Sequence, residues 1–111
     1  MSNRIPQVNK LIKEELGRII LQEVEIPTNN LTTITRVETV SNLSQSYIYI
    51  STIGKEAEEI FESLEKNVYH IQQSLNKRLN MRPVPKIIFK KEQETERAAH
   101  VEELLEKVKE K

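Results

Sequence analysis

Between Ala57 and Leu79, apolar residues recur at steps of three and four positions along an otherwise polar stretch. This period predicts an amphipathic helix, and such a helix is stable only when its apolar face is buried against other elements. On the pattern alone, residues 56–80 form one continuous helix. Residues 82–85, Arg-Pro-Val-Pro, are then predicted to be extended, because a residue that precedes proline avoids the helical region.

Shorter patterns before this helix predict what it packs against. Residues 4–22 have the same helical spacing, whereas residues 31–40 are rich in the β-branched residues typical of a strand. In residues 47–53 the side chains of Ile48 and Ile50 should face one side and those of Tyr47, Tyr49 and Ser51 the other. The short polar connection at residues 41–44 predicts that the two strands form an antiparallel hairpin.

Two further elements complete the predicted order. Residues 86–90 should form a short strand with Ile87 and Phe89 inward, and residues 98–108 a C-terminal amphipathic helix. Together these elements predict a single α+β domain spanning residues 1–111, in which helices cover one face of a three-stranded sheet. We expect neither a fourth strand nor a parallel pair after the hairpin.

The composition argues against catalysis, cofactors and membranes. Cysteine and aspartate are absent, His70 and His100 are far apart in the sequence, and Gly17 and Gly54 are isolated. These features exclude thiolate chemistry and a phosphate-binding glycine loop, and they predict neither an enzyme nor a metal, cofactor or small-molecule site. No apolar run approaches the ~20 residues of a membrane span, and the N-terminus lacks a signal peptide's apolar core, so we expect a cytoplasmic protein.

The chain has no net charge, but its charges are segregated. Residues 66–91 contain seven basic residues and no acidic one, whereas residues 1–65 contain six basic and ten acidic residues. Such segregation predicts one face for an anionic partner, although an ordinary solvated surface is the alternative. The helix dipole explains cations near a helix C-terminus, but it does not explain Lys86, Lys90 and Lys91, which lie beyond the predicted helix.

The predicted order, with two helices before the last strand, resembles the second type of KH domain, an RNA-binding fold. KH domains clamp single strands with a GXXG loop, which this sequence lacks. The chain instead resembles the ribosome-binding factor A family, whose members are KH-like and lack that loop. The resemblance is carried by residues 4–8, 15–20, 34–38, 43–44, 48–51, 75–82, 85–89, 96–97 and 102–105.

The resemblance implies a non-enzymatic factor that binds the immature small ribosomal subunit, assists processing and folding of its rRNA, and matters for growth in the cold. It implies a protein without cofactor, and we expect a monomer when the protein is free. Family members have a kink between two helices, where Asn67, Val68 and Tyr69 stand here without a glycine. The alternatives are a protein-interaction module, suggested by the acidic run at residues 56–65, and an RNA-binding regulator that acts outside the ribosome.

The cations of the acid-free segment are the predicted RNA contacts, since phosphate contacts need long cationic side chains and no base code. Arg78 and Arg82 are four positions apart and are predicted to project from one helix face. Tyr47 and Tyr49 could stack on bases, or they could simply cover the sheet. The candidate contacts are Lys77, Arg78, Arg82, Lys86 and Lys90, with Lys66 and Arg4 as weaker candidates.

Overall fold

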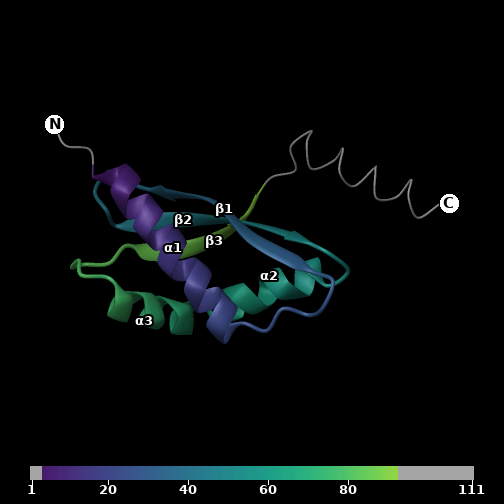
Figure 1. Ribbon diagram of the computed structural model, residues 1–111. Coiled ribbons are helices and arrows are strands. Elements are labelled where there is room, and N and C mark those ends of the chain that lie inside the picture. Colours follow the sequence, from purple (N-terminus) through teal and green to yellow (C-terminus); the bar gives the residue numbers. More distant parts are fainter. Residues whose placement is uncertain (1–3, 93–111) are drawn as a thin grey trace.

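The computed structural model describes residues 4–92, and three helices cover one face of a three-stranded sheet in it (Figure 1). The sheet order is β1-β2-β3, so β2 is the central strand. The predicted α+β class is therefore confirmed, and the predicted helix at residues 98–108 lies outside the described residues. The elements are α1 (Ile5–Glu23), β1 (Leu31–Thr39), β2 (Gln45–Ile53), α2 (Ala57–Lys66), α3 (Val68–Arg78) and β3 (Lys86–Lys91).

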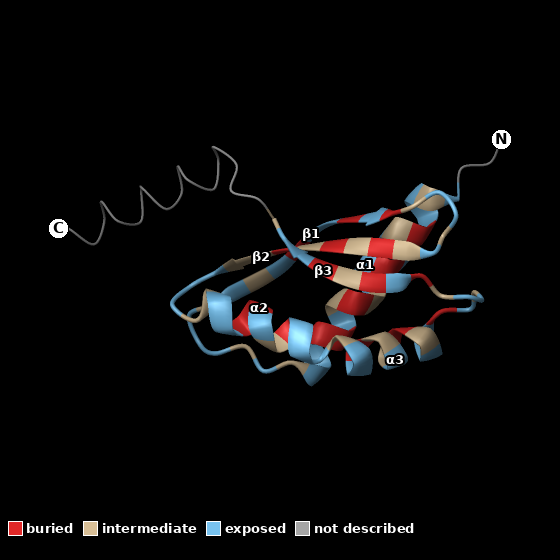
Figure 2. Cartoon of the chain, turned by 180° about the vertical axis from the view of Figure 1, so that it is seen from behind, coloured by how far each residue is buried: buried red, intermediate tan, exposed pale blue. Residues whose placement is uncertain are grey.

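One hydrophobic core lies between the helices and the sheet. The strands contribute alternate residues to it, which Figure 2 shows as red bands separated by paler ones. Ile48 and Ile50 of β2 and Ile87 and Phe89 of β3 are buried, as predicted. The helices contribute Val8, Ile12, Leu16, Ile19, Ile20, Phe61, Leu64, Ile71 and Leu75. Each aliphatic side chain removed from water stabilises the fold by about 1.5–3 kcal/mol before entropy is counted.

The alternation in β1 is interrupted by a bulge. The register shifts between Ile34 and Arg36, which pair with Ile50 and Tyr49, so Thr35 is the extra residue. Its hydroxyl donates to the carbonyl oxygen of Tyr49 at 3.2 Å. The extra residue allows both Ile34 and Val37, three positions apart, to face the core.

The last strand corrects one expectation, because β3 pairs with β2 in parallel, from Gln45 opposite Lys86 to Ile50 opposite Lys91. Two parallel neighbours need a long crossover connection. Here α2 and α3 supply it: they carry the chain back along the covered face, so β3 starts at the same end as β2 (Figure 1). The expectation that no parallel pair follows the hairpin was therefore wrong.

The predicted continuous helix is interrupted at Asn67, the residue that separates α2 from α3. Asn67 has φ −99° and ψ 11°, outside the regular helical geometry. Its side-chain amide donates to the carbonyl oxygen of Ser63 at 2.8 Å, and its own carbonyl still accepts from the Ile71 N–H at 2.9 Å. The kink that the resemblance implies is therefore present, and a side-chain hydrogen bond supports it where glycine is absent.

Candidate nucleic-acid interface

The structure brings part of the acid-free segment together where α3 ends and β3 begins. Lys77 lies in the last turn of α3, and Lys86 is the first residue of β3. Both are exposed, and neither forms an ion pair with another residue of the described part of the chain. Unpaired, exposed cations retain their full charge for an anionic partner, so these two are the strongest of the predicted contacts.

Arg78 and Arg82 do not project from one helix face, so that prediction was wrong. Helix α3 ends at Arg78, and Leu79 is already extended with ψ 138°. Arg78 turns toward α1, where its guanidinium lies 3.4 Å from the Glu15 carboxylate and donates to Gln22 at 2.8 Å. Its charge is therefore partly used in holding α3 against α1.

Arg82 lies in the loop between α3 and β3, and it is fixed to that loop by one nitrogen. Its Nη1 donates to the backbone carbonyls of Leu79 at 3.2 Å and Met81 at 2.9 Å. The Leu79 carbonyl stands just beyond the helix end, where such groups lack a helical partner. The remaining nitrogens of Arg82 have no partner in the described residues, so the guanidinium is oriented and still able to donate.

The other candidate cations are more scattered. Lys66 is the last residue of α2. The 11-residue helix α3, about 16 Å long, lies between it and the start of the loop that leads into β3. Arg4 precedes α1, and its side chain forms no capping hydrogen bond. Lys90 lies on the uncovered face of the sheet, 5.5 Å from the centre of the Tyr47 ring. Lys91 is paired with Glu58 of α2 at 2.6 Å.

The two tyrosines on the uncovered face are already in contact with cations. The guanidinium of Arg36 lies 3.8 Å above the centre of the Tyr49 ring and also pairs with Glu38 and Glu92. The hydrogen bond to Glu92 is the main cause that raises the pKa of Arg36; burial opposes it, and the charge of Glu38 adds to the rise. A base could stack on Tyr49 only by displacing Arg36 or by using the other face of the ring. Sequence reasoning missed Arg36, since its position depends on the bulge.

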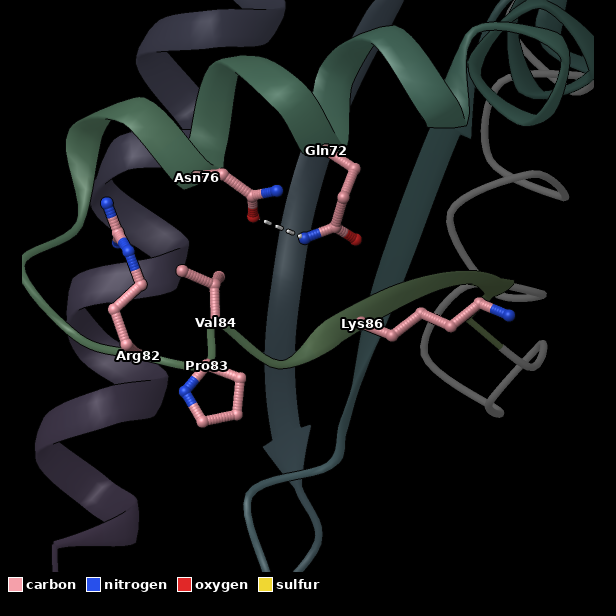
Figure 3. A pocket seen from close by; sticks show the side chains of 6 residues that line it. All are labelled: Gln72, Asn76, Arg82, Pro83, Val84 and Lys86. Atoms are coloured by element: carbon pink, nitrogen blue, oxygen red, sulfur yellow. Dashed lines mark hydrogen bonds between the residues drawn. The ribbon is translucent and has the colours of Figure 1, made fainter.

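A groove lies beside the second half of α3. It has a volume of about 480 Å³ and lies between α3 and the loop that leads into β3 (Figure 3). Gln72 and Asn76 line it from the helix, and Arg82, Pro83, Val84 and Lys86 line it from the loop and strand. A concave site with cationic and amide groups therefore lies within the part of the chain that has no acidic residue.

The structure describes His70, one of the two histidines of the chain. His70 is exposed and its Nε2 lies 2.8 Å from the Glu23 carboxylate, which ties α3 to the end of α1. Among residues 4–92 there is no group of three side chains suited to hold a metal ion. In the same range, no helix is long and apolar enough to cross a membrane.

The sequence is similar to that of ribosome-binding factor A from several bacteria. The family model of ribosome-binding factor A matches residues 4–105. Ribosome-binding factor A of Halothermothrix orenii is 34% identical over 109 residues, which are 96% of this chain and 89% of that protein. The protein of the same name from Desulfitobacterium hafniense is 29% identical over 110 residues, or 97% and 86% of the two chains.

Solved structures agree on the fold. The crystal structure of ribosome-binding factor A from Thermus thermophilus has a TM-score of 0.65 at 19% identity, covering 78% of this chain and 92% of that one. A homology model of the Thermus thermophilus factor, fitted into a cryo-EM map of its complex with the 30S subunit, has a TM-score of 0.64 at 23% identity. That match covers 74% of this chain and 88% of the other. By its sequence over nearly its whole length, this chain belongs to the ribosome-binding factor A family.

Proposed function

We propose that this protein binds the small ribosomal subunit during assembly and assists the maturation and processing of its rRNA. The family match over residues 4–105 carries the proposal, and the complex of the Thermus factor with the 30S subunit supports the choice of partner. In this proposal the chain acts in the cytoplasm as a single domain over residues 1–111. It is a monomer when free, needs no cofactor, and performs no chemistry of its own.

The distribution of charge supports a contact made mainly with phosphates. Lys77 and Lys86 are exposed and unpaired within the described chain, and the oriented guanidinium of Arg82 lies between them along the sequence. A surface of this kind recognises the shape of a folded RNA without reading its bases. Lys90, Lys66 and Arg4 would add contacts at the margin, whereas Arg78 would contribute less because Glu15 shares its charge.

The test is sedimentation with purified small subunits. We expect Lys77→Glu combined with Lys86→Glu to weaken binding by about a hundredfold or more, since each of the two lost charged contacts is worth ~1.5 kcal/mol or more. The matched control is Lys10→Glu combined with Lys13→Glu, which makes the same change in net charge at exposed positions of α1. If both double variants are as stable as the wild type and bind small subunits equally well, the assignment of Lys77 and Lys86 to the interface is wrong. Failure of the wild-type chain to sediment with small subunits would contradict the function.

A further inference from the structure

The groove between α3 and the 82–86 loop has a fixed width, because Gln72 spans it at one end. Its Oε1 accepts from the backbone N–H of Ile87 at 2.8 Å, and its Nε2 donates to the carbonyl oxygen of Pro85 at 3.1 Å. One side chain of α3 thus holds both the end of the loop and the start of β3. The groove is therefore formed before any ligand arrives, which reduces the entropy lost on binding.

A cation stands at each end of the groove. In Figure 3, Arg82 and Lys86 lie on opposite sides of Val84, and the Lys86 side chain extends away from Arg82. No acidic residue lines the groove. Hydrogen bonds from Nη1 to the Leu79 and Met81 carbonyls hold Arg82 in place, so the two charges are kept apart by the loop. The arrangement suits a ligand with two separated negative charges better than a single small anion.

The part between the cations is apolar on one side and polar on the other. Val84 points toward α3 beside the ring of Pro83, while Asn76 points down from the helix (Figure 3). The Oδ1 of Asn76 accepts from Gln72 Nε2 at 3.0 Å, which fixes the amide orientation. The Nδ2 of Asn76 then remains as a donor without a partner in the described residues. A flat ligand with hydrogen-bond acceptors on its edge would fit this arrangement: its face would contact the apolar side, and its edge would accept from Asn76.

We propose that the groove holds one unstacked nucleotide of the bound RNA, with its flanking phosphates against Arg82 and Lys86 and its base between them. A nucleotide within a strand has the required features, namely two phosphates joined through a ribose that carries a flat base with acceptors on its edge. The volume of the groove, about 480 Å³, falls within the range of pockets that hold small ligands, about 300–1,000 Å³. An acidic peptide supplies the charges without the flat group, and inorganic phosphate supplies neither the span nor the base. The inference rests on the proposed function, because it names one contact within the same RNA interface.

The first test uses the 111-residue chain and a small probe, uridine 3′,5′-bisphosphate, followed by NMR. We expect the probe to shift the resonances of the Asn76 side-chain amide and of the Val84 and Lys86 backbone amides. A dissociation constant on the order of millimolar is expected for so small a ligand. Absence of these shifts at several times that concentration would overturn the proposal. So would equal shifts with inorganic phosphate, or tighter binding of a triglutamate peptide.

A matched pair of variants tests the groove itself. Asn76→Asp keeps the acceptor for Gln72 but adds a negative charge inside the groove, and it should weaken binding of the bisphosphate at least about fivefold. Gln73→Glu makes the same charge change at an exposed position of α3, three residues before Asn76 and outside the groove lining. It should leave binding within about twofold, as expected for a solvated charge. Equal effects of the two variants would overturn the proposal.

The same pair separates this inference from the proposed function. With purified small subunits, Asn76→Asp should reduce co-sedimentation while Gln73→Glu retains it. If the wild-type chain binds subunits and Asn76→Asp binds equally well, the groove is not part of the interface and the inference fails alone. If the wild-type chain does not bind subunits, the proposed function fails, and the bisphosphate titration still decides whether the groove takes a nucleotide.

Discussion

Gly54 occupies a position that no larger residue can fill without rearrangement. It follows the last residue of β2 and has φ +135°, a conformation that L side chains rarely adopt. A Cβ atom there would lie 2.1 Å from the Oδ1 of Asn30. That oxygen accepts from the Glu56 N–H at 3.1 Å, and the Asn30 Nδ2 donates to the Glu56 carboxylate at 2.7 Å. Gly54 therefore permits the contact that joins the 24–30 loop to the start of α2.

The two glycines should respond to alanine in opposite ways. Gly54→Ala should lower the free energy of unfolding by about 1–3 kcal/mol, the usual cost of backbone strain. Gly17→Ala should raise it by about 0.5–1 kcal/mol, because an added Cβ meets nothing within 4 Å and alanine favours the helix. Urea unfolding at constant slope measures both changes. A stabilising effect at Gly54 would refute the strain argument.

At the residue scale, the sequence predicts where cations are concentrated, but it does not predict which groups each of them contacts. The absence of acidic residues between positions 66 and 91 predicts a cationic region, since charge is a property of composition. The partners of each cation depend on tertiary structure. Arg78 is shared with Glu15 of α1, which lies 63 positions earlier, and nothing local to residues 75–82 indicates this contact. The groove was missed because its lining comes from two separated segments.

At the scale of elements, the hydrophobic period predicted whether each described segment is a helix or a strand. It did not predict the break between α2 and α3 or the direction of β3. The apolar steps continue unbroken through Asn67, because both helices turn the same face to the core. The direction of β3 depends on the end of the sheet at which α3 finishes, and the hydrophobic period carries no information about that position. One signal for the bulge was available: Ile34 and Val37 are an odd number of positions apart, which a regular strand with one buried face does not allow.

The contact between the end of α1 and α3 should make stability depend on pH. A hydrogen bond from Ser74 is the main cause that lowers the pKa of Glu23; burial opposes it, and His70 and Arg78 add to the lowering. Because the pKa is lower in the folded state, this stabilisation is present above the unfolded pKa and is lost as pH falls through the folded value. Glu23→Gln should therefore reduce the rise in stability between about pH 3 and pH 6. Urea midpoints across that range measure it, and an unchanged profile would contradict the assignment.

At the scale of the whole molecule, a chain without net charge contains one segment, residues 66–91, that has cations and no acidic residue. If four to six cations contact phosphates, the logarithm of the affinity for small subunits should fall with the logarithm of salt concentration with a slope of roughly −3 to −5. The Lys77→Glu and Lys86→Glu double variant should reduce the magnitude of this slope by roughly 1.5. Isolated single strands should bind poorly, because the acidic remainder of the chain repels RNA at long range. Binding that is insensitive to salt, or tight binding of a short single strand, would contradict this mechanism.

The central position of β2 has a consequence for the order in which the molecule folds. A short turn separates β2 from its antiparallel neighbour β1, whereas residues 54–85 separate it in sequence from its parallel neighbour β3. Closing a long loop is entropically costlier than closing a short one, so the hairpin should form early and β3 should dock late. Until then, one edge of β2 is an open template for pairing with other chains. Pulsed hydrogen exchange during refolding should protect the amides of Tyr47 and Tyr49, on the β1 side of β2, before those of Ile88 and Lys90, on the β2 side of β3. Simultaneous protection would refute this order.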